Sequence, residues 1–94
     1  MTSYTLRQIC ELLELDEDLA GELVREAVLV ADAPERGLFS PIMLERARVA
    51  RELVQELEVN VAGAAVIVRL REELVELRRA TSELARELER VRGR

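Results

Sequence analysis

The C-terminal third of the chain carries an apolar heptad repeat, which predicts one long helix with an unsatisfied face. From Ile67 onward, apolar residues recur at alternating steps of three and four positions, with Thr81 as a polar interruption. Asn60 can cap this helix, which we expect to run to about Val91 and to measure roughly 45 to 50 Å. The predicted seam consists of Ile67, Leu70, Leu74, Leu77, Leu84, Leu88 and Val91.

The preceding helix is too short to cover this seam, so the expected partner is a second copy of the chain. We expect that preceding helix over about residues 41–57, roughly half the length of its successor. The sequence therefore predicts a homodimer through the long helix. Charges beside the seam suit a parallel pair, because acidic and basic residues occupy opposite flanking positions. These residues are Glu73 and Glu87 at g, and Arg71, Arg78 and Arg92 at e.

Capping residues predict where three shorter helices begin. Thr5 opens a capping-box pattern ahead of a helix over about residues 5–13. After a tight turn, Asp16 can cap a second helix that runs to about residue 27. Ser40, followed by proline at the first helical position, predicts the start of the third helix.

A small β wing is expected between the second and third helices. Residues 28–30 and 38–39 predict the two strands of a hairpin, because they flank a segment rich in turn-forming residues. The expected fold class is therefore all-α, with a helix-turn-helix, a small wing and a long C-terminal coiled-coil helix. We expect a winged helix-turn-helix-like domain over residues 1–57 and a dimerisation helix over residues 58–94.

The composition disfavours most catalytic and metal-binding chemistry. The chain has no His, no Trp and one Cys, so common general bases, zinc ligands and base-stacking side chains are almost absent. We therefore expect neither an enzyme nor a cofactor or metal site. The apolar stretches fall short of the roughly 18 residues of a membrane span, and the single cysteine cannot pair within the chain. Both features indicate a cytoplasmic protein that does not span a membrane.

Three short stretches resemble the MerR-type winged helix-turn-helix superfamily. They are Tyr4-Thr5-Leu6, Arg36-Gly37-Leu38-Phe39-Ser40 and Val59-Asn60-Val61-Ala62-Gly63. The last is similar to the heat-shock repressor branch and to the small MerR-like chaperone-modulator family, CbpM. This resemblance covers nearly the whole chain and implies an antiparallel coiled coil. We give that orientation more weight than the flanking charges, because exposed ion pairs contribute only about 0 to 1 kcal/mol.

The charge distribution departs from that of DNA-binding MerR proteins, in which the second helix enters the major groove. Residues 11–26 hold seven acidic residues against Arg25 alone. Over residues 1–40 three arginines face nine acidic residues, whereas residues 41–94 hold eleven arginines and ten acidic residues. The wing offers only Arg36. A surface of this sign repels the phosphate backbone, so nucleic acid is not the expected partner.

The resemblance to the chaperone modulators implies a protein partner instead. In that family the partner is a DnaJ-like (CbpA-type) co-chaperone, contacted at its J-domain, which presents a basic helix to the acidic Hsp70 chaperone. We expect the acidic helix-turn-helix to occlude that basic surface, because opposite charges steer and select partners. The expected contacts, chosen by their charge, are Asp18, Glu22 and Glu26, with Glu17 and Arg25 beside them.

Two alternatives stay open from the sequence. The acidic residues can serve solubility and the positive end of the helix dipole. The chain can also be a MerR-type transcriptional regulator that binds DNA through Arg36, Arg46, Arg48 and Arg51. Arg48 lies about 160° from Arg46 around a helix, so we expect these arginines on a solvated face rather than in one basic patch.

Overall fold

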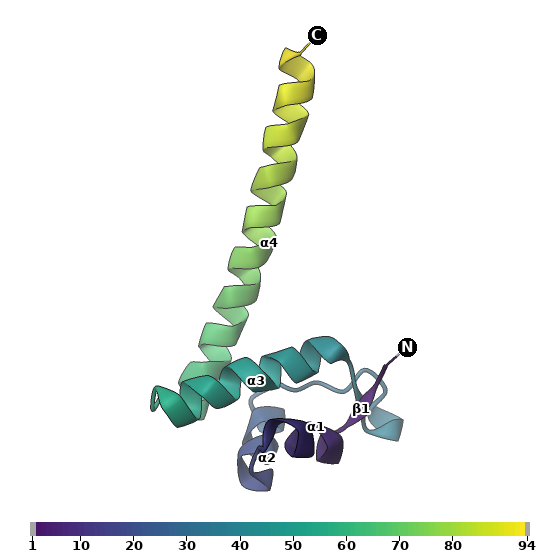
Figure 1. Ribbon diagram of the computed structural model, residues 1–94, viewed down its shortest axis with the longest axis vertical. Coiled ribbons are helices and arrows are strands. Elements are labelled where there is room, and N and C mark those ends of the chain that lie inside the picture. The colour runs from purple at the N-terminus through teal and green to yellow at the C-terminus, as the bar shows by residue number, and fades with distance from the viewer. Residues whose placement is uncertain (1, 94) are drawn as a thin grey trace.

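A computed structural model describes residues 2–93, which form four α-helices and a small antiparallel sheet (Figure 1). In chain order the elements are β1 (Tyr4–Thr5), α1 (Leu6–Leu13), α2 (Glu17–Arg25), a 3-10 turn (Pro34–Arg36), β2 (Leu38–Phe39), α3 (Pro41–Glu56) and α4 (Val61–Arg92). This arrangement confirms the expected all-α class with a helix-turn-helix, a small β element and a long C-terminal helix.

The predicted capping residues open all four helices. Thr5 and Gln8 form a capping box in which each side chain accepts the backbone N–H of the other residue, at 3.1 and 2.8 Å. The Asp16 carboxylate accepts an N–H of α2 at 2.7 Å. The side chains of Ser40 and Asn60 cap α3 and α4 in the same way. Local sequence therefore fixes where each helix begins.

The predicted strand over residues 28–30 was wrong. The N–H groups of Val28 and Leu29 both donate to the carbonyl of Leu23, at 2.9 and 3.2 Å, and so close the end of α2. Both side chains are buried in the core. These donors are therefore not available to a hairpin, and β2 pairs instead with β1 at the start of the chain. The segment before the 3-10 turn contacts β2 only through Asp32 and Ala33, whose backbone groups hydrogen-bond with Leu38.

α2 is also shorter than expected and ends at Arg25. Ala27 has a left-handed backbone (φ 59°), which an α-helix cannot continue through. Glu14 has the same conformation (φ 52°) at the end of α1. These two left-handed residues make the sharp turns that bring α1, α2 and the following segment around one core.

The core consists mainly of aliphatic and small side chains contributed by all four helices. Phe39 is its one aromatic member, as the low aromatic content requires. Its members are Ile9, Leu15, Ala20, Leu23, Val28, Leu29, Phe39, Ala47, Ala50, Ala64, Ala65 and Val68. The first two turns of α4 therefore complete the core of the N-terminal elements.

α4 extends away from this core as a single rod (Figure 1). Only its base packs against α3, where Ala47 and Ala50 of α3 and Ala64 of α4 are fully buried. Such small side chains allow helices to approach closely. The longest dimension of the molecule is 57 Å. None of the helices in the described residues combines the length and apolar composition that a membrane crossing requires.

Candidate functional site

The exposed side of α2 forms an acidic face made of Glu17, Asp18, Glu22 and Glu26. All four side chains are exposed, as is that of Arg25. The face arises from helical spacing. Ala20 and Leu23 are fully buried on one side of α2, so the charged positions lie on the opposite, exposed side. The structure thus brings the five sequence-predicted contact residues together on and just after α2.

The acidic face carries no internal neutralising partner. Every ion pair among residues 2–93 lies within or between α3 and α4. Asp18 and Glu22, four positions apart on one helix, also repel each other by a few tenths of a kcal/mol. The charge of this surface is therefore available to a partner.

Helix stability explains only half of the acidic face. Glu17 and Asp18 lie in the first turn of α2, where negative charge interacts favourably with the helix dipole. Glu22 lies past the middle of α2, and Glu26 is its C-terminal capping residue. Negative charge near the C-terminus of a helix is unfavourable. The acidic residues at this end therefore favour a role in binding over one in local stability.

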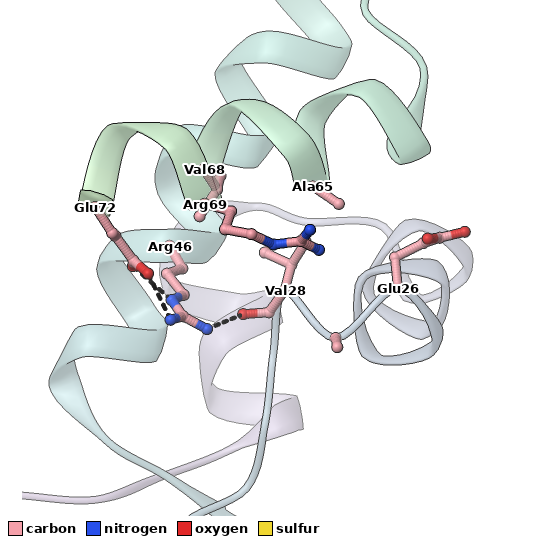
Figure 2. Close-up of a pocket in the computed structure, with 8 residues that line it drawn as sticks. Glu26, Val28, Arg46, Ala65, Val68, Arg69 and Glu72 are labelled. Carbon is pink, nitrogen blue, oxygen red and sulfur yellow. Dashed lines mark hydrogen bonds and ion pairs between the residues drawn. The ribbon is translucent and has the colours of Figure 1, made fainter. Parts of the chain in front are cut away.

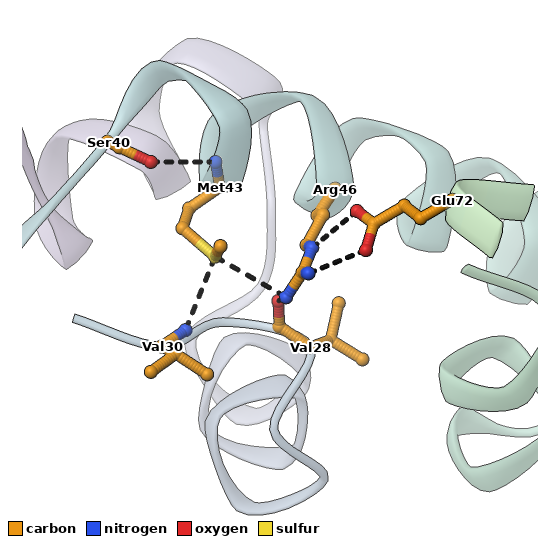
Figure 3. Close-up of polar contacts among 6 residues, drawn as sticks. All are labelled: Val28, Val30, Ser40, Met43, Arg46 and Glu72. Atoms are coloured by element: carbon orange, nitrogen blue, oxygen red, sulfur yellow. Dashed lines mark hydrogen bonds and ion pairs between the residues drawn. The ribbon is translucent and has the colours of Figure 1, made fainter. Parts of the chain in front are cut away.

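Arg46 was expected on a solvated face, and that expectation was wrong. Its guanidinium donates two hydrogen bonds of 2.6 Å to the carboxylate of Glu72 and a third, of 3.3 Å, to the carbonyl of Val28 (Figure 3). Nη1 also contacts the sulfur of Met43. Arg46 therefore joins α3 to α4 and to the segment after α2, and its donors are not free for phosphate.

The other arginines proposed for DNA binding also fail to form a basic patch. Arg48 pairs with Glu45 and Glu52 along α3. The hydrogen bond to Glu45, together with the charges of both carboxylates, raises the pKa of Arg48 above its usual range. Arg51 has its Nε buried without a hydrogen-bond partner among the described residues. Of these four arginines, only Arg36, in the 3-10 turn, is both exposed and without an ion pair among residues 2–93.

A small cleft of about 200 Å³ lies beside the acidic face, at the junction of α3, α4 and the end of α2 (Figure 2). The pair of Arg46 and Glu72 forms one wall, and Arg69 extends over Val28. The Glu26 carboxylate points away from the cleft. The contacts of Arg46 in this wall join α4 to the segment after α2, while the Glu26 carboxylate faces outward with the rest of the acidic face.

Cys10 is half-buried and packs against the core, as expected for a small apolar residue. Burial raises the pKa of its thiol, and the nearby carboxylates of Glu17, Asp16 and Glu11 raise this pKa further. A raised pKa lowers the thiolate fraction, so the surroundings of Cys10 suppress its reactivity.

The predicted seam lies on the free side of α4. All seven of its residues are at least 39% exposed, from Ile67 at 39% to Leu84 at 70%. The buried Ala64 and Val68 lie about 60° and 100° around the helix from Ile67 but about 120° and 160° from Leu70, so the seam leaves the buried side of α4 within its first turn. α3 therefore does not compete for the seam. The dimer itself stays a prediction.

A family model described as MerR HTH family regulatory protein matches residues 4–86, from β1 to the last turns of α4. No curated protein and no solved structure matches the chain. The narrower likeness to the chaperone modulators stays a prediction. The family match covers the helix-turn-helix, the paired strands and most of the long helix, and the chain thus belongs to the MerR helix-turn-helix family of regulatory proteins.

Proposed function

We propose that the chain binds a basic protein surface through its acidic face, and that the target is the J-domain of a DnaJ-like co-chaperone. The observation that carries this proposal is the exposed, internally unpaired set of carboxylates on α2. α2 is the helix that a MerR protein would place in the DNA major groove. Its charge suits a cationic protein and disfavours a polyanion.

The mechanism is occlusion of a docking surface. The resemblance to the chaperone modulators implies a J-domain whose basic helix engages Hsp70. When the acidic face covers that helix, Hsp70 loses access to it and co-chaperone activity falls. No covalent step is needed. The chain acts as a dimer through the α4 seam, so one assembly presents two acidic faces and can engage two J-domains.

The test is calorimetric titration of the J-domain into the protein at low salt. Asp18→Lys combined with Glu22→Lys is expected to weaken binding at least about tenfold, because close charge pairs at interfaces couple by more than about 1.4 kcal/mol. The control is Glu56→Lys combined with Glu89→Lys, which makes the same change in net charge at two exposed positions outside the acidic face. Equal affinities of the wild type and the α2 variant would remove these residues from the interface.

A second candidate function is sequence-specific DNA binding, which the match to a family of regulatory proteins favours. Against it stand the acidic α2 and the internal pairing of Arg46 and Arg48. Fluorescence anisotropy with labelled duplexes separates the two functions. Sequence-selective binding at physiological salt would support a DNA-binding regulator and overturn the proposed protein-binding role.

A further inference from the structure

An open groove lies between α1 and α2, next to the acidic face. Leu6, Arg7 and Cys10 line it from α1, and Glu17 and Ala20 line it from α2. Its volume is about 310 Å³. The side chains of Leu6 and Cys10 are half-buried and Ala20 is fully buried, so the base of the groove is apolar. We call this feature the α1–α2 groove.

The α1–α2 groove is continuous with the acidic face, because Glu17 belongs to both. The raised pKa of Cys10 reports the electrostatic surroundings at the base of the groove. After burial, its causes are three carboxylates, those of Glu17, Asp16 and Glu11. Arg7 is the one cation that lines the groove. The groove thus combines an apolar base with one anion, Glu17, and one cation, Arg7, and on the Glu17 side it continues into the acidic face. This arrangement suits a partner with an apolar centre and basic residues on the side that meets the acidic face.

Charge alone does not account for tight binding at this surface. Exposed ion pairs contribute only about 0 to 1 kcal/mol each, whereas affinity at protein interfaces comes mostly from a few side chains buried in pockets. Burial of one Leu or Ile side chain contributes about 1.5 to 3 kcal/mol. The groove is at the lower end of the roughly 300 to 1,000 Å³ typical of ligand sites and is open, so it suits a side chain presented by a protein.

We propose that the α1–α2 groove holds an aliphatic side chain of a basic amphipathic helix, whose Arg or Lys residues pair with Glu17 and the rest of the acidic face. This inference rests on the proposed function and deepens it, because it specifies the partner. The partner helix carries an aliphatic anchor flanked by basic residues. The apolar anchor provides most of the affinity, and the charges provide orientation and rate of encounter.

Two short synthetic helical peptides test the anchor without any natural partner. One carries Leu along one face and Arg along the other, and its matched control carries Ser in place of Leu. The Leu peptide is expected to bind at least about tenfold tighter than the Ser peptide, which corresponds to burial of one aliphatic side chain. It is also expected to slow alkylation of Cys10 by iodoacetamide, because Cys10 lines the groove. Equal affinities, or unchanged alkylation with the Leu peptide bound, would overturn the proposal.

A blocked groove gives an independent check. Modification of Cys10 with N-phenylmaleimide places a bulky group in the groove and is expected to abolish the preference for the Leu peptide. Circular dichroism verifies that the modified protein stays folded, and titration of Cys10→Ser verifies that loss of the thiol alone leaves the preference intact. A modified protein that folds and still prefers the Leu peptide would place the anchor elsewhere.

The J-domain separates this inference from the proposed function. A J-domain that binds without slowing alkylation of Cys10 leaves the proposed function standing and overturns the groove as its anchor site. A J-domain that fails to bind, while the Leu peptide binds and protects Cys10, overturns the proposed target and supports the groove.

Discussion

Arg46 on α3 and Glu72 on α4 form a two-pronged ion pair, in which Nε and Nη2 each donate a hydrogen bond of 2.6 Å to one carboxylate oxygen. The two residues lie 26 positions apart in the chain. Nη1 of Arg46 also reaches the carbonyl of Val28, just after α2. One guanidinium thus sets the position of the long helix relative to the end of the acidic face.

Removal of this pair is expected to loosen α4 from the rest of the fold. Glu72→Gln and Arg46→Gln should each lower the free energy of unfolding by about 1 to 3 kcal/mol, because hydrogen bonds between charged, partly buried groups contribute on that scale. Urea denaturation followed by circular dichroism measures the change. A double-mutant cycle is expected to show coupling between the two positions, since each substitution removes the same interaction.

Arg79→Gln is the matched control, because Arg79 pairs with Glu76 and Glu83 on the exposed part of α4. Arg79→Gln is expected to lower the free energy of unfolding by less than Arg46→Gln does, since solvent screens exposed pairs. If Arg46→Gln and Arg79→Gln lowered the free energy of unfolding equally, the ion pair between α3 and α4 would contribute no more to stability than an ordinary surface pair.

Glu26 provides a test that separates binding from stability. Glu26→Gln removes negative charge from the C-terminal end of α2 and is expected to stabilise the protein by about 0.3 to 1 kcal/mol. The same substitution should weaken J-domain binding. Asp18→Asn is the paired comparison, since it removes charge from the first turn and should lower both stability and affinity. Thermal denaturation and calorimetry measure the two effects, and unchanged affinity in Glu26→Gln would exclude Glu26 from the interface.

The reactivity of Cys10 reports the electrostatics of the α1–α2 groove. Its pKa is raised, first by burial and then by Glu17, so the pH profile of alkylation should lie at higher pH in the folded protein than in urea. Glu17→Gln should move the folded profile back toward lower pH and speed alkylation at pH 8 by less than about fivefold, as expected for one screened charge. Glu35→Gln, at an exposed site in the 3-10 turn, should leave the profile unchanged. A folded profile that coincides with the urea profile would contradict the raised pKa.

The helices and their starts could be predicted from the sequence because those signals are local. Thr5, Asp16, Ser40 and Asn60 each cap a helix through a side chain that reaches only two or three residues ahead. The acidic face followed in the same way, since the spacing of apolar and charged positions along one helix decides which side is buried.

The strand pairing and the ion pair between α3 and α4 could not be predicted, because both depend on contacts between distant positions. Tyr4 pairs opposite Phe39, yet two-residue strands leave no alternating pattern in the sequence. In the sequence, Arg46 cannot be distinguished from a surface arginine, because its partner Glu72 lies on another helix. In each case the three-dimensional arrangement of the helices decides the outcome and local sequence does not.

The seam of α4 makes the most direct prediction about assembly. Leu77→Glu is expected to convert a dimer into a monomer at micromolar concentration, because it places charge in the middle of an apolar interface. Val75→Glu is the matched control, since Val75 is 59% exposed and Leu77 is 62% exposed, but Val75 lies outside the seam. Thr81 already satisfies its hydroxyl within the helix by donating to the carbonyl of Leu77 at 2.8 Å, so Thr81→Leu should tighten association. Sedimentation equilibrium measures the molecular mass of the wild type and of the three variants. A wild-type protein with the mass of one chain would refute the dimer.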